Sequence, residues 1–200
     1  YRAAIAIRPS AADARYGLGK ALYALRDPQA AIREYVEAIR LGYDEPPAHA
    51  ALGLARIAAG DAEGAERELV RAGGADPRIL AEAWKQLGWL RAREGKLAEA
   101  RRSLDRALAV APADAAALLD HSSVCVKLGD REAAERSLER LVAADPGHPS
   151  ARVRLAEVRL ASGDPEGAAE ALREFLAQPG ADPKLVPAAR EMLSGLGASR

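Results

Sequence analysis

The side chains best suited to nucleophilic or metal chemistry are one cysteine, Cys125, and three histidines, His49, His121 and His148. On a helix, His121 and Cys125 would share a face, as a nucleophile and its base could. The sequence supplies no third group to orient His121, and a cysteine on the packing side of a helix is usually a buried, inert thiol. No two histidines have the spacing of metal ligands. We therefore expect no catalytic residue, no metal site and no cofactor.

Charge and hydropathy narrow the classes of partner. The chain has 29 Lys and Arg against 29 Asp and Glu, so its net charge is zero, whereas a dedicated nucleic-acid binder usually has a basic excess. Charged runs such as Arg91–Glu94 alternate in sign, which is typical of solvated helix faces. No apolar run approaches the roughly 18 residues of a membrane span. These features disfavour nucleic acid as a partner and direct insertion into a membrane.

The elements that would position these residues repeat at a fixed period. An alanine recurs at spacings of 34, 35, 34 and 34 residues, at Ala31, Ala65, Ala100, Ala134 and Ala168. A small residue recurs at the same spacings, at Gly19, Gly53, Gly88, Ser122 and Ala156. A turn glycine (Gly60, Gly95, Gly129 and Gly163, with Arg26 in the first unit) and a closing proline (Pro9, Pro77, Pro112 and Pro146) follow the same period. Such a period indicates a helical repeat protein.

The local chemistry within each unit predicts two helices joined by a turn. Gly60 and Asp61 form a stop-and-start pair, because glycine tolerates the left-handed conformation that ends a helix and aspartate can cap the next helix. Asp76–Pro77 predicts the end of a second helix. Small residues such as Gly88, facing Ala100, would let two helix backbones approach closely.

The motif Trp84-x2-Leu87-Gly88, followed by Ala100-x3-Leu104, Ala107 and Pro112, resembles the tetratricopeptide repeat (TPR) family. The family pattern prefers tyrosine where this chain has Arg91. The resemblance implies an all-α fold, a right-handed α-solenoid of stacked antiparallel helix pairs in a TPR superhelix. The first helix of each repeat would line the concave side. It also implies a non-catalytic scaffold that binds a peptide or helix of a partner protein.

We expect residues 1–200 to form a single TPR array of five full repeats, with an N-terminal half repeat and a C-terminal capping helix. The predicted boundaries are 1–11 for the half repeat, then 12–45, 46–79, 81–114, 115–148 and 149–182 for repeats 1 to 5, and 183–196 for the capping helix. Leu80 would be an inserted residue in a connecting turn, and Gly195, Gly197 and the terminal Ser199 and Arg200 would fray. Because Tyr1 falls inside a repeat, we expect the native N-terminus to lie before it.

The resemblance also implies which residues face the groove. Carried over to this sequence, the partner-binding residues are Tyr16, Lys20, Tyr23, Leu54, Ile57, Lys85, Trp89, Arg93, Leu119, Ser123, Val126, Lys127, Val153, Glu157 and Leu160. Lys85, Trp89 and Arg93 are spaced four apart and would form one stripe along a helix. A rigid aromatic side chain between two cations could anchor a partner. The alternative is that Trp89 packs against an adjacent helix and that the cations are solvated.

Several functions stay open at this point. The leading interpretation is a protein-binding scaffold, and the alternative is a regulatory or substrate-docking TPR arm of a larger enzyme. RNA binding is disfavoured by the zero net charge, whereas self-association through the array ends remains possible. A single cysteine cannot form an internal disulfide, which fits a reducing compartment such as the cytoplasm and leaves an oxidising one such as the periplasm open.

Overall fold

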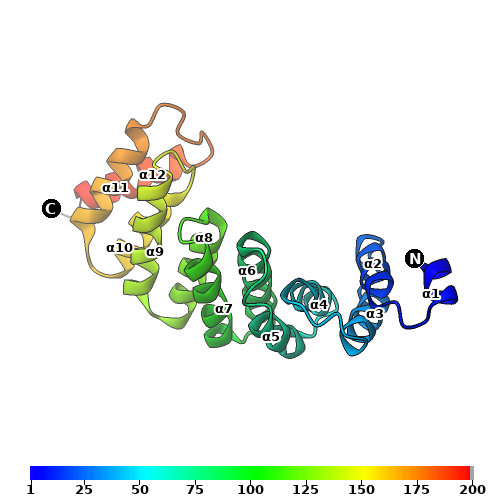
Figure 1. The fold of residues 1–200 in the computed structure, drawn as a ribbon. Coiled ribbons are helices and arrows are strands. Elements are labelled where there is room, and N and C mark those ends of the chain that lie inside the picture. Colours follow the sequence, from blue (N-terminus) through cyan, green and yellow to red (C-terminus); the bar gives the residue numbers. More distant parts are fainter. Residues whose placement is uncertain (199–200) are drawn as a thin grey trace. The chain divides into compact units, whose positions relative to one another are not determined.

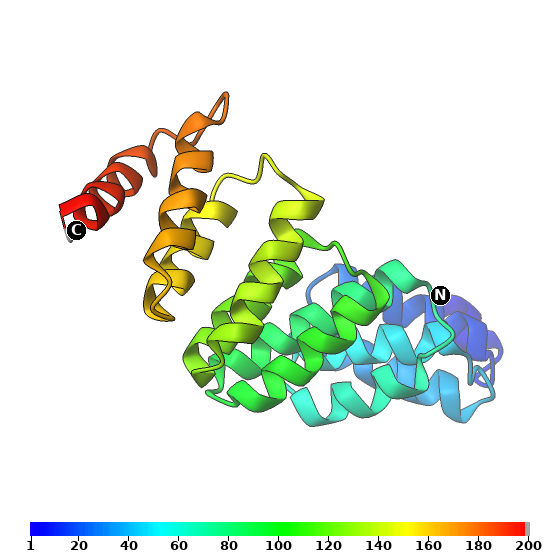
Figure 2. The same ribbon diagram turned by 90° about the vertical axis from the view of Figure 1, so that its left-hand side faces the viewer.

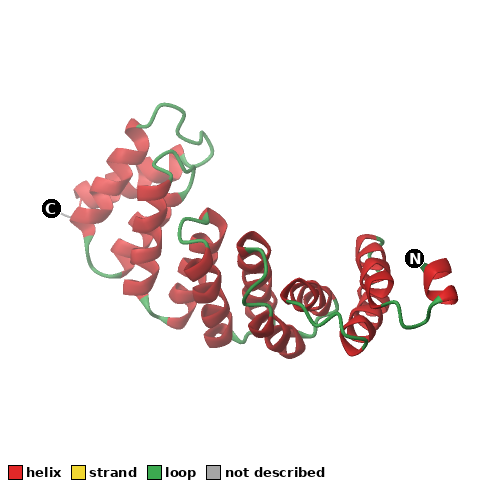
Figure 3. Cartoon of the chain, viewed as in Figure 1, coloured by secondary structure: helices red, strands yellow, loops and turns green. Residues whose placement is uncertain are grey.

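The computed structural model describes residues 1–198, and within them every regular element is a helix (Figures 1 and 3). The chain divides into two compact units, Tyr1–Pro112 and the part that begins at Ala113. None of the described helices is both long and apolar enough to cross a membrane. The expected all-α fold of stacked helix pairs is confirmed within each unit.

The first unit contains seven helices, which the two views show packed side by side (Figures 1 and 2). They are α1 (Arg2–Ile7), α2 (Ala12–Ala24), α3 (Pro28–Arg40), α4 (Pro46–Ala58), α5 (Ala62–Arg71), α6 (Pro77–Arg93) and α7 (Leu97–Val110). The closest packing is between sequence neighbours, which gives the pairs α2/α3, α4/α5 and α6/α7. Contacts of α4 with α3 and of α6 with α4 and α5 join one pair to the next.

The second unit repeats this arrangement. Its helices are α8 (Ala115–Leu128), α9 (Arg131–Ala144), α10 (Ala151–Ala161), α11 (Pro165–Ala177) and α12 (Val186–Ala198). The pairs are α8/α9 and α10/α11, α10 packs on α9, and α12 packs on α11. The five helix pairs of the described chain match the expected number of repeats, while the precise repeat boundaries and the single continuous array stay predictions.

The turn inside each pair forms as its sequence indicates. Gly60 has a φ of 81°, and the Asp61 side chain accepts a hydrogen bond of 2.8 Å from the Gly64 amide at the start of α5. The other turn glycines also have positive φ, and Arg26 replaces glycine in the first pair with a φ of 63°. An L-residue in that region is strained, so the turn geometry overrides the preference of Arg26.

Close approach within each pair depends on the recurring small residue. A Cβ atom added at Gly88 would lie 2.8 Å from the Leu104 side chain and 3.3 Å from the Ala100 carbonyl oxygen. At Gly53 the same atom would lie 2.8 Å from Leu69. Larger side chains at these glycines would force the helices apart, which confirms the predicted contact.

The connection before α6 differs from the prediction. Helix α5 ends at Arg71, ahead of two glycines, and Pro77 begins α6 instead of closing α5. Asp76 caps α6 by accepting a hydrogen bond of 2.8 Å from the Arg78 amide. Aspartate followed by proline suits an N-cap and first helical position, because proline needs no amide partner there. Leu80 is therefore helical and buried, and its placement in a turn was wrong.

The last helix also differs in its bounds. Helix α12 begins at Val186 and continues through Gly195 and Gly197, so the expected fraying there was wrong. Ala189 is fully buried against the second unit's core, whereas Arg190 is exposed. One face of α12 therefore packs while the charged residue lies on another. Residues 199–200 of the predicted frayed tail lie outside the described residues.

Candidate functional site

The first helices of the three pairs in the first unit, α2, α4 and α6, frame a pocket of about 330 Å³. Side chains of α2 and α4, the start of α6 and one residue of α3 line it: Tyr16, Lys20, Tyr23, Tyr35, Pro47, Ala50, Ala51, Leu54, Ala75, Asp76 and Ile79. Four of the residues expected from sequence, Tyr16, Lys20, Tyr23 and Leu54, are brought together here. Ile57, one turn further along α4, is half-buried and does not line the pocket.

The wall from α2 is aromatic. Tyr16, Lys20 and Tyr23 recur at helical spacing and therefore share one face. The ring of Tyr16 stacks on Tyr43, with centroids 4.6 Å apart and planes 20° apart. The Lys20 Nζ lies 5.8 Å from the centroid of the Tyr16 ring, which places a cation beside the aromatic wall.

The floor is Tyr35, which comes from α3. Its ring is 2% exposed and lies 5.6 Å from Tyr16, centroid to centroid. A Cβ atom at Gly19 would lie 2.7 Å from the Tyr35 ring, so this glycine of α2 makes room for the floor. Burial raises the pKa of Tyr35 and of Tyr16, and Tyr43 raises the pKa of Tyr16 further. Both tyrosines are therefore neutral at physiological pH.

Sequence reasoning missed Tyr35 and Tyr43, because it considered only groove-facing positions of first helices. Tyr35 lies in a second helix, and Tyr43 lies in the connection that follows it. One signal was present for Tyr35. Tyr35 lies on the helix that pairs with the helix of Gly19. A bulky aromatic residue opposite a glycine indicates a ring that fills the space left by the missing side chain.

A second group lies further along α6. The side chain of Trp89 is 55% exposed, and the Arg93 guanidinium stacks on it at 4.7 Å from the ring centroid. The Lys85 Nζ forms an ion pair of 2.8 Å with Glu82 on the same helix. The exposure of Trp89 favours the binding interpretation over packing against a neighbouring helix. We call Trp89 and Arg93 the α6 stack.

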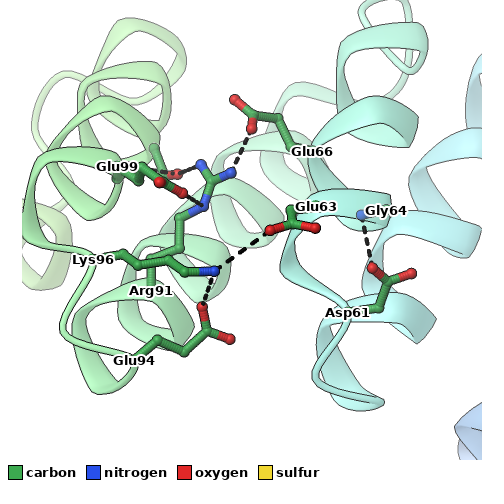
Figure 4. Close-up of polar contacts among 9 residues, drawn as sticks. Asp61, Glu63, Gly64, Glu66, Arg91, Glu94, Lys96 and Glu99 are labelled. Carbon is green, nitrogen blue, oxygen red and sulfur yellow. Dashed lines mark hydrogen bonds and ion pairs between the residues drawn. The ribbon is translucent and has the colours of Figure 1, made fainter.

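Arg91, between these residues in sequence, has a different environment. It is 1% exposed and lies between the second and third helix pairs (Figure 4). Its guanidinium forms an ion pair with Glu66 of α5, donates a hydrogen bond of 2.9 Å to Ser103 Oγ, and places Nε 3.3 Å from Glu99 Oε2. The hydrogen bond from Arg91 lowers the pKa of the Glu66 carboxyl, against the opposing effect of burial. The interpretation of Arg91 as part of a solvated face was wrong.

Lys96 supports the same junction. Its Nζ lies 3.5 Å from Glu63 of α5 and 3.2 Å from Glu94 at the end of α6 (Figure 4). Together with Arg91, it holds α6 against the preceding pair. Arg91 makes its contacts on roughly the opposite side of α6 from Trp89, since residues two positions apart lie about 200° apart around a helix.

The expected residues of the second unit are more dispersed. Val126 is 49% exposed, and Lys127 and Glu157 are exposed, whereas Leu119 and Leu160 pack partly against the core. Ser123 Oγ accepts a hydrogen bond of 3.2 Å from Arg154, which joins α8 to α10. Val153 is 4% exposed within the core cluster. Its side chain is not available to a partner, so we leave it out of the proposed surface.

His49, His121 and Cys125 lie in packed surroundings, whereas His148 is half-buried in the connection after α9. His121 is 6% exposed, and its Nδ1 lies 2.8 Å from Ser137 Oγ and 3.6 Å from the buried Cys125 thiol. His49 is also buried, with one ring nitrogen 2.7 Å from Glu68 and the other 2.7 Å from Asp44. His121 is thus a hydrogen-bonded core residue.

Comparison with known families decides the identity of the fold. A tetratricopeptide repeat model matches residues 1–42, 16–78 and 119–184, and a second such model matches residues 91–146. The chain belongs to the tetratricopeptide repeat family. Members of this family generally act as scaffolds for protein–protein interaction, and that is the general role of this chain. A search of curated proteins found no match.

Solved structures of TPR proteins share the fold. YrrB, reported as a TPR protein with an unusual peptide-binding site, is 20% identical over 95% of this chain and 97% of its own, with a TM-score of 0.69. MamA from Desulfovibrio magneticus RS-1 is 20% identical over 82% of this chain and 92% of its own, with a TM-score of 0.61. PilF from Pseudomonas aeruginosa is 18% identical over 96% of this chain and 91% of its own, with a TM-score of 0.54.

Proposed function

We propose that the first-helix surface of the first unit, made by α2, α4 and α6, binds a peptide or helix of a partner protein. The observation that supports this most directly is the exposure of Trp89. A large aromatic side chain left 55% exposed and stacked by Arg93 is typical of an interface anchor.

The pocket on the same first helices gives this surface a second anchor point. Apolar pockets with a few polar groups at the rim are the usual shape of binding sites. Two separated anchors suit an extended segment or a helix better than a small molecule. The peptide-binding site reported for YrrB supports this proposal as an analogy of fold.

The remaining expected residues belong to the second unit, for which we propose a separate binding surface on its own first helices. Val126, Lys127 and Glu157 are exposed on α8 and α10, the first helices of their pairs. Leu119, Ser123 and Leu160 accompany them with partial exposure. We assign these residues a supporting role, because no large aromatic side chain of the described second unit is exposed.

The test compares three immobilised proteins for what they retain from a lysate of the source cell. They are the parent chain, a Trp89→Ala/Arg93→Glu variant, and a control variant Arg33→Glu/Val36→Ala. Arg33 and Val36 are exposed on the second helix α3, so the control also removes an apolar side chain and reverses a charge. A partner retained by the parent and the control but lost from the Trp89 variant supports the proposal. Identical retained sets would contradict it.

A further inference from the structure

We propose that the pocket between α2, α4 and the start of α6 takes one apolar side chain of the partner segment, and that Lys20 binds an acidic residue next to it. The inference rests on the proposed function, because it names the chemistry of the segment that the first-helix surface binds. The preferred partner is thus an apolar anchor flanked by aspartate or glutamate.

The interior of the pocket is apolar and rigid. Tyr35 forms the floor at 2% exposure, and Ala50 at 1% exposure lies beside it. Tyr16 is braced from behind by its stack on Tyr43 and does not need to reorganise when a ligand enters. A preformed wall lowers the ordering cost of binding. A volume of about 330 Å³ is at the small end of ligand pockets, which suits a side chain better than a large cofactor.

The rim is exposed, which leaves the pocket accessible. Lys20, Pro47, Asp76 and Ile79 lie around it with exposed side chains. A main chain crossing these residues could insert one side chain while its neighbours contact the rim. Ile79 is 44% exposed and extends the apolar surface beyond the pocket itself.

The two charged side chains at the rim, Lys20 and Asp76, differ in how far other groups offset their charges. Lys20 contacts the Tyr16 ring, and no carboxylate of the described residues forms an ion pair with it. Asp76, across the pocket, already accepts a hydrogen bond from the Arg78 amide at the N-terminus of α6. The positive end of that helix offsets part of the aspartate charge. Lys20 is therefore the uncompensated charge, and an acidic neighbour of the anchor complements it.

The α6 stack also presents a positive charge to a partner. Arg93 is exposed, and its guanidinium contacts Trp89 without an ion pair to a carboxylate in the described chain. Two cations without acidic partners, one at each anchor, favour a segment with acidic residues on both sides of its apolar positions. Charge complementarity of this kind selects partners more than it adds affinity.

The test is a selection of random 12-residue peptides, displayed on phage, against the intact parent chain. We expect enriched peptides to share an apolar residue with aspartate or glutamate within two positions. The best peptide is then synthesised and its affinity measured for the parent and two variants. Ala51→Phe fills the pocket from a half-buried position and is expected to lower affinity more than tenfold.

The second variant, Lys20→Glu, reverses the exposed charge and leaves the packed floor untouched. It is expected to lower affinity about threefold, the effect of an exposed ion pair. A peptide with lysine in place of the acidic residue should recover that loss on Lys20→Glu alone. This reciprocal exchange keeps the test decisive if Ala51→Phe fails to fold, which thermal unfolding would reveal.

Four outcomes would overturn the inference. Enriched peptides with basic flanks would contradict the role of Lys20. Peptides that lose affinity on Trp89→Ala/Arg93→Glu but not on Ala51→Phe would remove the pocket and leave the proposed function standing. No enrichment, or equal binding to every variant, would contradict both. A dimer of the parent in solution that Ala51→Phe dissolves would show a second copy as the occupant and would also overturn it.

Discussion

Two arginines on α6, only two positions apart, have opposite environments. Arg91 is 1% exposed and joins α5, α6 and α7 through Glu66, Ser103 and Glu99, whereas Arg93 is exposed and stacks on Trp89. Residues two positions apart lie about 200° apart around a helix, so one guanidinium stabilises the fold and the other is available to a partner. Residue type alone does not separate these roles, and the face of the helix does.

The largest expected effect comes from removing the buried guanidinium. Arg91→Ala should lower the free energy of unfolding by about 3 kcal/mol, because it removes a buried side chain and leaves the partly buried Glu66 and Glu99 carboxylates without their counter-charge. The value lies at the lower end for such losses, since the Glu66 and Glu99 side chains remain 33% and 35% exposed to water. Urea denaturation at neutral pH measures it. Arg93→Ala is the matched control, with an expected change within about 0.5 kcal/mol. Equal losses for the two arginines would contradict the comparison.

The next largest effect on stability is expected from overpacking the contact between α6 and its paired helix α7. Ala100→Leu should destabilise the first unit by about 1–3 kcal/mol, because Ala100 is fully buried where α7 approaches Gly88 closely. Thermal or urea unfolding measures the change. Ala109→Leu, on an exposed face of α7, is the control. A variant at position 100 as stable as the parent would contradict the assigned helix contact.

A smaller effect is expected on the stability of the fold at acidic pH. The Arg91 hydrogen bond lowers the pKa of Glu66 below its usual value of about 4.5, so the folded chain holds the ionised form more strongly than the unfolded chain does. This contribution is fully present above the unfolded pKa and is lost as the pH falls through the folded pKa. The parent should therefore lose stability below about pH 4.5, and Arg91→Ala should lose less over the same range. Urea midpoints between pH 6 and pH 3 measure the difference, and parallel profiles would argue against the pairing.

Sequence predicted the repeat and its close contacts because these follow from local spacing. Gly53 and Gly88 meet the residues that the period assigns to them. The predictions for Arg91 and Val153 were wrong for one reason: the residues that surround them come from other helices. Arg91 was assigned to a solvated face because its acidic partner Glu66 comes from the preceding pair, and the side chain of Val153 was placed in a groove although the core covers it.

The connection before α6 shows a different limit. Asp76–Pro77 can end one helix or begin the next, and the two glycines before it had already ended α5. The sequence predicted only part of the pocket, because its floor, Tyr35, comes from a second helix. Arg91 was misplaced for the same reason, since its partner Glu66 comes from another helix. The pattern of groove-facing positions on first helices therefore predicts the pocket residues on those helices and misses the residue from a second helix.

The smallest expected effect on folding belongs to the outer face. Trp89→Ala should change the free energy of unfolding by less than about 0.5 kcal/mol, because more than half of the side chain is already in water. The same change should weaken binding of the selected peptide at least tenfold, as the loss of an interface anchor does. Urea unfolding and fluorescence anisotropy of the labelled peptide measure the two quantities. Loss of stability together with intact binding would reverse the roles assigned to the two faces.

The central claim is that the face of α6 that carries Trp89 and Arg93 binds the partner segment. The chain has two tryptophans, of which Trp84 is 5% exposed, so a Trp84→Phe chain reports on Trp89 alone. The measurement is the emission of that chain during titration with the selected peptide, with acrylamide quenching at each end of the titration. The account predicts a shift to shorter wavelength and weaker quenching at saturation, because the bound segment removes Trp89 from water. An unchanged spectrum and unchanged quenching, while anisotropy shows the peptide bound, would contradict it.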